Sequence, residues 1–180
     1  MNNTTKPKIK LKPLEMEDAN AIFKIIDHQR EYIGQWLPFV QYTREIEDTR
    51  KFVSSMLEGP EQHLSEVYSI MLNDELIGLI SFKDISKVNQ STEIGYWISR
   101  DFQGQGIMTN AVRQLCKIAF EEWDMNRVVI KCAEGNIPSK RIPEKIGFQY
   151  EGTERESIVM IDGNFVNLEV FSLLKSDTIK

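Results

Sequence analysis

The stretch Trp97–Thr109, with the sequence WISRDFQGQGIMT, constrains the fold more than any other part of the chain. An apolar strand pattern ends near Ser99, Gly104 and Gly106 follow, and an amphipathic helix pattern begins directly after them. Glycines let a backbone approach a ligand closely, and the free N–H groups and the dipole of a helix N-terminus attract anions. The stretch therefore predicts either an anion-binding turn suited to a pyrophosphate or a turn that only reverses the chain.

Two common phosphate-binding turns do not fit this stretch. A Walker loop ends in Gly-Lys-Ser/Thr, and that ending is missing after Gly104. A dinucleotide-binding turn has a third glycine and lies among parallel strands. Here the preceding strand patterns are separated by Asn73-Asp74 and by the polar run Ser86–Ser91, which predicts an antiparallel meander.

Hydrophobic periodicity along the rest of the chain predicts an α/β fold with a mixed, mostly antiparallel sheet of about seven strands and about four helices. The expected strands cover residues 9–14, 67–72, 77–82, 92–99, 127–132, 157–161 and 165–174. The expected helices follow Asp18, begin at Thr43, and cover 104–121 and 139–146. The last two strands are joined by Asp162-Gly163, a strong hairpin signal.

Length and composition limit the classes of protein that this chain can belong to. The 180 residues suit one domain, and we expect an arm at 1–7, a single domain at 8–175 and a tail at 176–180. A net charge of −5 argues against nucleic acid as a partner. Two cysteines without a CxxC pair and two histidines predict no metal site. No apolar run reaches the roughly 18 residues of a membrane span, and residues 1–8 lack the core of a signal peptide, so we expect no membrane partner and a cytoplasmic location.

Several motifs, in this order along the chain, resemble the GNAT family of N-acetyltransferases. Gln103–Met108 is similar to the family's coenzyme A signature Gln/Arg-x-x-Gly-x-Gly/Ala, although Met108 replaces the last small residue. Asn136–Arg141 followed by Glu144–Phe148 resembles the second signature, Asn-x-x-Ser…Glu-Lys-x-Gly-Phe. Further stretches resemble the RimJ/RimL branch, which acetylates protein N-termini: Glu93–Trp97, Gly106–Thr109, Gln35–Phe39 and Asp48–Arg50. The resemblance covers about residues 8–174 and implies a GNAT fold.

The resemblance also implies how acetyl-coenzyme A, the expected co-substrate, would be held. It would lie between the strand that ends near Ser99 and the strand that ends near Cys132. Its pyrophosphate would sit on the N–H groups of Gly104 and Gly106. The other expected coenzyme-binding residues are Trp97, Ile98 and Ser99 along the strand, Gln103, Gln105, Ile107, Met108 and Thr109 at the turn, and Asn136 and Ser139 after the second strand.

The expected reaction is attack of a neutral amine on a thioester, which calls for a base. An α-amino group has a pKa near 7.7–8.0 and lysine one near 10.4, so a protein N-terminus needs only a modest base. Glu93, on the strand before the glycine turn, is the first candidate, and a solvated strand carboxylate is its other reading. RimL-like proteins often carry a later glutamate where this chain has Ile158 or Val159. Glu156 would replace it through a small register shift, or that base is absent.

The departing thiolate calls for a hydrogen-bond donor. The resemblance places the hydroxyl of Ser139 near the sulfur, and the other reading makes Ser139 the N-cap of the helix that follows. Asn136 is either a ligand of the pantetheine arm or an ordinary turn residue. Cys132 either faces the coenzyme thiol or is a buried, inert cysteine; with no evident histidine partner, it suggests no covalent mechanism.

An aromatic group after the first helix completes the predicted site. Tyr32, Trp36, Phe39 and Tyr42 either line an acceptor pocket or pack in the core, and we expect core packing for two of the four. Three functions remain open: acetylation of a protein N-terminus such as that of a ribosomal protein, acetylation of a small amine, and binding of acetyl-coenzyme A without catalysis. A homodimer is a further expectation from similar proteins.

Overall fold

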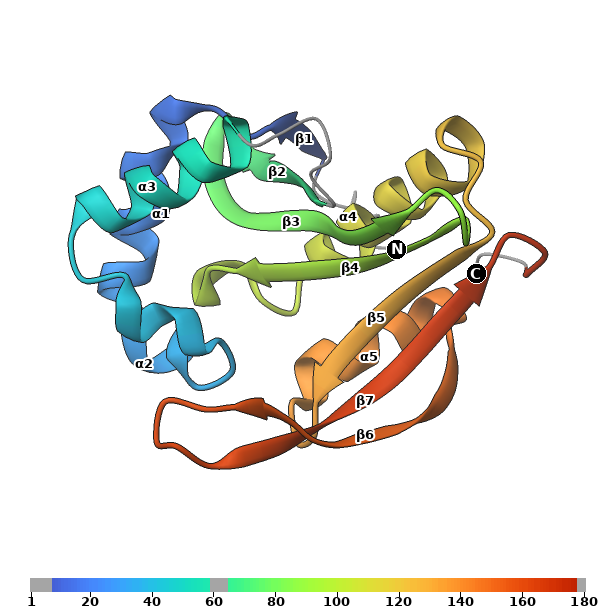
Figure 1. The fold of residues 1–180 in the computed structure, drawn as a ribbon. Coiled ribbons are helices and arrows are strands. Elements are labelled where there is room, and N and C mark those ends of the chain that lie inside the picture. The colour runs from blue at the N-terminus through green and yellow to red at the C-terminus, as the bar shows by residue number, and fades with distance from the viewer. Residues whose placement is uncertain (1–7, 59–64, 178–180) are drawn as a thin grey trace, which may run out of the picture.

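Two neighbouring parallel strands, β4 (Ser91–Ile98) and β5 (Arg127–Ala133), lie at the centre of a seven-stranded sheet (Figure 1). The computed structural model describes residues 8–58 and 65–177. The order across the sheet is β1-β2-β3-β4-β5-β7-β6, and every neighbouring pair other than β4 and β5 is antiparallel. The outer strands are β1 (Ile9–Pro13), β2 (Ser65–Leu72), β3 (Glu75–Ser86), β6 (Gln149–Val159) and β7 (Phe165–Leu174).

Helices cover both faces of this sheet. On one face lie α4 (Ile107–Lys117), which continues as a π-helical turn, and α5 (Ile137–Ile146). Near the other face lie α1 (Ala19–His28), α2 (Arg30–Gly34) and α3 (Ile46–Leu57), at the left of Figure 1. None of the helices within 8–58 and 65–177 is long and apolar enough to cross a membrane.

The predicted α/β order is confirmed, with differences at several boundaries. The described residues 8–58 and 65–177 form five α-helices, because the short α2 occurs where the sequence predicted only a connection. The second predicted helix begins at Ile46 and not at Thr43, because Glu45 and Asp48 form its capping box. Asp18 occupies the N-cap position of α1, but its side chain makes no cap hydrogen bond and instead bonds Lys12 and Ser69.

The apolar core is divided by the sheet into two parts, and β4 contributes to both. Ile94 and Tyr96 pack with the α4 and α5 side, whereas Trp97 packs with α1 and α3. Because successive side chains of a strand point to opposite faces, the even-numbered residues of β4 face α4 and α5, and the odd-numbered ones face the other way. The same alternation applies to β5, where Ile130 and Cys132 join the α4 and α5 side.

The two central strands separate part of the way along their length. Their parallel pairing joins Ser91–Glu93 to Arg127–Val129. Beyond that point β4 remains paired with β3, and β5 remains paired with β7. No strand in the described parts of the chain pairs with the facing edges of Ile94–Ile98 and Ile130–Ala133, so their backbone polar groups are available to a ligand.

Candidate active site

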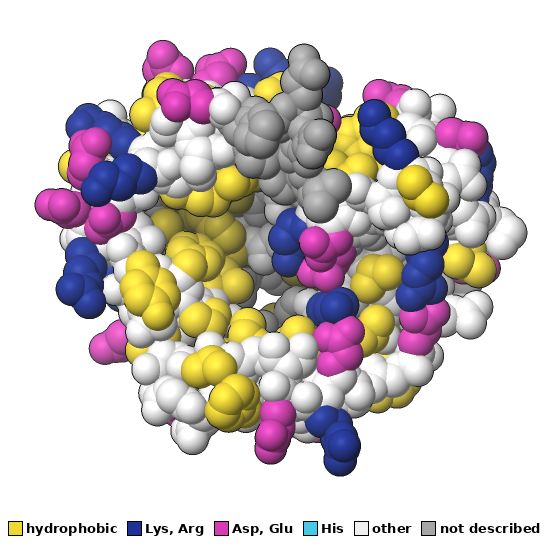
Figure 2. Space-filling model, viewed as in Figure 1, with side chains coloured by type: hydrophobic (Ala, Val, Ile, Leu, Met, Phe, Trp, Pro, Cys, Tyr) yellow, Lys and Arg dark blue, Asp and Glu magenta, His cyan; other side chains and the backbone are white. Residues whose placement is uncertain are grey.

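A cavity of about 1390 Å³ lies where β4 and β5 separate. Its lining includes the glycine turn, both separated strands, the start of α5, and the segment from α1 to α3. Figure 2 shows the molecule hollowed on this face, with apolar side chains on one side of the hollow and a group of charged side chains on the other. One cavity therefore connects the predicted anion site with the predicted acceptor site.

The glycine turn has the backbone geometry that an anion site requires. Gly104 and Gly106 have φ angles of +74° and +75°, in the left-handed region that favours glycine. Gly106 is the N-cap of α4, an 11-residue helix whose first N–H groups have no partner within the helix. A Cβ atom at either glycine would meet no other atom within 4 Å, so open space surrounds the turn.

Several predicted coenzyme residues at this turn have partners within the protein. The side chain of Gln103 donates a hydrogen bond to Tyr32, and that of Gln105 donates to the carbonyl of Asp101 at 3.2 Å. Gln29, which the sequence analysis did not single out, donates to Ser99 Oγ at 2.9 Å. Ser99 and Gln105 are not among the residues that line the cavity.

The other residues predicted at the turn and along β4 do line the cavity. Met108, which replaces the small residue of the coenzyme A signature, is 6% exposed. Its side chain belongs to the core that α4 forms with the sheet. The remaining cavity-lining residues of this group are Trp97, Ile98, Gln103, Gly104, Gly106, Ile107 and Thr109.

Charged side chains cluster on the odd-numbered face of β4. Glu93 is ion-paired with Lys83 at 2.8 Å and with Lys131 at 3.8 Å, and Lys131 also contacts Glu154 at 2.8 Å. Only 13% of the Glu93 side chain is exposed, and it lines the cavity together with both lysines. A Cβ on Gly95 would come within 2.6 Å of Lys83 Cε, so this glycine leaves the space in which the lysine crosses the strand.

Neutral hydroxyl and thiol groups meet on the opposite side of the cavity. Ser139 Oγ lies 3.3 Å from the Tyr96 hydroxyl and 3.4 Å from Cys132 Sγ. The Tyr96 hydroxyl donates a hydrogen bond to the Ser139 carbonyl at 3.1 Å. Burial raises the pKa of the Tyr96 phenol and of the Cys132 thiol, so both groups are protonated at neutral pH.

Asn136, and not Ser139, is the N-cap of α5. Its side-chain oxygen accepts the Ser139 N–H at 3.3 Å, which satisfies one of the free donors at the helix start. The helix begins at Ile137, two residues earlier than predicted, and the Ser139 hydroxyl is left to line the cavity. Asn136 lines the cavity as well.

The structure does not bring Glu156 to the cavity. A bulge does occur between Glu154 and Ile158, and within it Glu156 has a φ of +51°. Its side chain is exposed, and its N–H donates to Asn167 at 2.8 Å. Ile158 is the cavity-lining residue of this part of β6.

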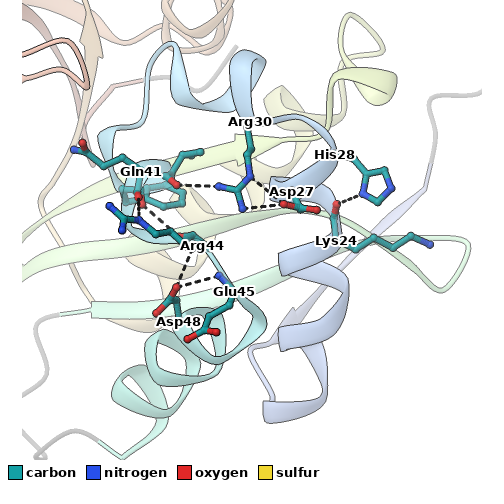
Figure 3. Close-up of polar contacts among 11 residues, drawn as sticks. Lys24, Asp27, His28, Arg30, Gln41, Arg44, Glu45 and Asp48 are labelled. Atoms are coloured by element: carbon teal, nitrogen blue, oxygen red, sulfur yellow. Dashed lines mark hydrogen bonds and ion pairs between the residues drawn. The ribbon is translucent and has the colours of Figure 1, made fainter.

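Tyr32, Trp36, Phe39 and Tyr42 all line the cavity, and none of the four is fully buried. The connection that carries Phe39 and Tyr42 is held by several polar contacts, some of which Figure 3 shows. Arg30 pairs with Asp27 at 2.9 Å and donates to the carbonyl of Val40 at 3.3 Å. Figure 3 also shows Asp48, which caps α3 by accepting two backbone N–H groups.

Thr49 is an exception to the pairing of buried polar groups. It is 2% exposed and lines the cavity, and among the described residues its Oγ1 is the buried side-chain atom without a hydrogen-bond partner. Within the same parts of the chain, no group of three or more His, Cys, Asp or Glu side chains could hold a metal ion.

Tyr96, Lys83 and Lys131 line the cavity but were not predicted from the sequence as site residues. Tyr96 lies inside Glu93–Trp97, one of the stretches that resemble the RimJ/RimL branch. Strict alternation along β4 predicts that it lies on the face opposite to Glu93. The two lysines carry no comparable signal, because their proximity to Glu93 depends on the pairing of three strands.

The family model, the related sequences and the solved structures that this chain matches all belong to acetyltransferases. Residues 8–149 match the Acetyltransferase (GNAT) domain. The chain is 35% identical to YdaF of Bacillus subtilis (strain 168), provisionally named a ribosomal N-acetyltransferase, over 94% of this chain and 92% of the relative. It is 31% identical to the ribosomal-protein-serine acetyltransferase of Escherichia coli (strain K12), over 80% of each. A solved structure of RimL, a ribosomal L7/L12 alpha-N-protein acetyltransferase in complex with coenzyme A, superposes with a TM-score of 0.88 at 25% identity, over 96% of this chain and 97% of that one.

Proposed function

The chain belongs to the GNAT acetyltransferase family, and from this membership we propose that it transfers the acetyl group of acetyl-coenzyme A to the N-terminal α-amino group of a protein. The observation that carries the proposal is the single cavity, which joins the glycine turn of Gly104 and Gly106 to the aromatic segment of Tyr32, Trp36 and Phe39. A ternary complex needs such a connection, because the amine must reach the thioester directly.

The residues around the turn suit a coenzyme. The open space and left-handed backbone at Gly104 and Gly106 admit a pyrophosphate against the N-terminus of α4. The unpaired edge of Ile94–Ile98 suits the amides of a pantetheine arm, which would add to β4 as a short strand does. Acetyl-coenzyme A supplies an activated acetyl group when it is bound there.

Glu93 is the proposed group that receives the amine proton, directly or through a water molecule. It lies on the acceptor side of β4, lines the cavity and is mostly buried. The neighbouring ammonium groups of Lys83 and Lys131 disfavour a second cation in the same place. This arrangement suits an α-amine, whose pKa of about 7.7–8.0 is low enough for the neutral form to bind, better than it suits a lysine.

A protein acceptor is further supported by the aromatic lining. Tyr32, Trp36 and Phe39 offer flat apolar surface for the first residues of a peptide. The relatives named above, which act on ribosomal proteins by name, make such an acceptor the first to try.

The proposal is tested in two steps. Calorimetry measures the Kd of coenzyme A and of acetyl-coenzyme A, and binding of both is expected. A thioester-consumption assay then compares peptides with free N-termini, the same peptides with blocked N-termini, and spermidine, with mass spectrometry to locate the acetyl group. Turnover of free N-terminal peptides alone supports the proposal. Turnover of spermidine alone identifies a small-amine enzyme, and tight coenzyme binding without turnover of any acceptor identifies a binding module.

A further inference from the structure

The carbonyl of Ser139 lacks the backbone donor that an α-helix normally supplies. In a helix the N–H of residue i bonds the carbonyl of residue i−4, and four positions after Ser139 the chain has Pro143, which has no N–H. Ser139 is the third residue of α5, so its carbonyl would otherwise be bonded within the helix. The sequence of α5 itself therefore leaves an acceptor free beside the cavity.

Tyr96, from another part of the fold, supplies the hydrogen-bond donor that the Ser139 carbonyl lacks. Its hydroxyl, on β4, donates to the Ser139 carbonyl at 3.1 Å across a separation of 43 residues. The donation uses the one hydroxyl hydrogen that Tyr96 has, so its oxygen can only accept from the Ser139 hydroxyl, 3.3 Å away. The serine hydroxyl is thus held in a defined orientation, with Cys132 as its other neighbour at 3.4 Å.

We propose that Tyr96 is the positioning residue of the leaving-group side: held by the carbonyl that Pro143 leaves free, it fixes the position of the Ser139 oxygen beside the place that the sulfur of the coenzyme would take. The inference rests on the proposed function. When the thioester C–S bond breaks, the electron pair stays on sulfur, and the Ser139 O–H turns from the Tyr96 oxygen to donate a hydrogen bond to the thiolate.

The ionisation states agree with these roles. Burial raises the pKa of Tyr96 well above its ordinary value, so the phenol remains a hydrogen donor throughout the working pH range. Burial also raises the pKa of Cys132, which keeps it a thiol that can donate to Ser139 and makes it a poor nucleophile. Tyr96, Ser139 and Cys132 are therefore neutral, and the nearby ion pair of Lys140 and Glu169 acts on Cys132 with two charges of opposite sign.

The test is a double-mutant cycle of Tyr96→Phe and Ser139→Ala with two readouts. The first is kcat and KM for acetyl transfer. The second is calorimetric Kd at pH 7 and pH 9.5 for coenzyme A and for desulfo-coenzyme A, whose difference reports stabilisation of the bound thiolate. Tyr68→Phe is the matched control, because it removes the phenol oxygen of a half-buried tyrosine of β2 that does not line the cavity.

We expect each single substitution to lower kcat about tenfold, the effect of one ordinary hydrogen bond, with KM for acetyl-coenzyme A nearly unchanged. At pH 9.5 each should lose most of the wild-type preference for coenzyme A over desulfo-coenzyme A. In the Ser139→Ala background, Tyr96→Phe should cost less than about twofold more, because it acts through the serine. Tyr68→Phe should leave both readouts at wild-type values.

A third variant tests the role of Pro143. Pro143→Ala restores an N–H that competes with Tyr96 for the Ser139 carbonyl. It should raise the midpoint of thermal unfolding, because an interior proline destabilises a helix, and should lower kcat about threefold. A variant that is both more stable and slower cannot be explained by damage to the fold. An unchanged kcat would show that the free carbonyl is not what holds Tyr96.

The outcomes separate this inference from the proposed function. If the wild-type protein neither binds coenzyme A nor transfers acetyl groups, the proposed function fails. If the wild type is active and Tyr96→Phe matches it in kcat and in thiolate preference, or if the two substitutions add independently, the inference about Tyr96 alone is overturned.

Discussion

The two sides of the cavity are lined by different kinds of chemical group. On the proposed coenzyme side, the lining consists of backbone and neutral groups: the left-handed glycines Gly104 and Gly106, the unpaired edge of β4, and the hydroxyls of Tyr96 and Ser139. On the acceptor side, charged and aromatic side chains dominate, with Glu93 between two lysines. One strand serves both sides, because alternate residues of β4 face opposite ways.

This difference matches the demands of the two partners. A pyrophosphate is already charged and needs N–H donors at fixed positions, which a backbone provides without side-chain entropy. An amine must change its protonation state, so its side of the site needs charges that act on that equilibrium. Substitutions that change backbone geometry should therefore damage the coenzyme side, and substitutions that change charge should damage the acceptor side.

The largest effect is expected at the glycine turn. Gly106→Val should weaken coenzyme A binding about a hundredfold, because a β-branched residue resists the left-handed conformation by about 1–2 kcal/mol and the relaxed backbone loses hydrogen bonds to the anion. Calorimetry gives the Kd. Gly163→Val is the matched control: Gly163 also has a positive φ and open space around it, but lies in the β6–β7 turn. Equal losses of coenzyme affinity in both variants would contradict the assignment of the turn.

Removal of the acceptor-side carboxylate should have the next largest effect. Glu93→Gln is expected to lower kcat at least about tenfold, because it removes the carboxylate that receives the amine proton, while the Kd of coenzyme A stays unchanged. Glu156→Gln should lose less than about twofold, because Glu156 is exposed and does not line the cavity. Steady-state kinetics with an N-terminal peptide provide the check. An unaltered rate in Glu93→Gln would remove Glu93 from the mechanism.

A smaller effect, an increase in stability, is expected at Thr49, a residue of α3 that lines the cavity. Thr49→Val should stabilise the protein by about 1 kcal/mol, because it replaces a buried hydroxyl without a partner by a methyl group of similar size. For a chain of this length the midpoint of thermal unfolding should rise by about 2–4 °C. Thr92→Val is the contrasting variant, since the Thr92 hydroxyl donates to the Lys83 carbonyl at 2.9 Å and its loss should destabilise. A Thr49→Val protein that unfolds earlier than wild type would contradict the unpaired state of this hydroxyl.

The smallest effect concerns the charged face farther from the cavity. Hydrogen bonds from Arg127 and then from Ser172 lower the pKa of Glu151 to about 2. Because the pKa is lower in the folded state, the stabilisation is fully present above about pH 4.5 and is lost as the pH falls toward 2. The Glu151 side chain is 40% exposed, so its contribution should be less than about 1 kcal/mol.

Denaturant unfolding of wild type and Glu151→Gln across this range measures the contribution. The stability difference between the two proteins should be present at pH 7 and should shrink between pH 4.5 and 2. A difference that does not change with pH would mean that the charge of Glu151 contributes nothing.

Much of the fold could be predicted because the relevant signals are local. The two glycines before an amphipathic helix, the Asp162-Gly163 hairpin and the alternating strands depend on neighbouring residues only. The misses included α2, which has no side-chain cap, and the start of β6, which lies at Gln149 and not at Ser157. They also included the start of α3 and the cap of α5, where capping side chains decided between nearby boundaries. At the site, the glycine turn could be predicted, but the ion pairs of Glu93 and the exposed position of Glu156 could not, because they depend on strand register and on a bulge.

The sequence by itself determined the order of the elements, the glycine turn and the presence of a proline inside α5. It also determined that Ser139 would have a carbonyl without a helical donor, since that follows from Pro143 alone. Only the tertiary structure decided that Tyr96 meets this carbonyl and that Lys83 and Lys131 meet Glu93. The physical reason is that a strand specifies which residues share a face, whereas the groups that face them are set by the pairing and packing of distant segments.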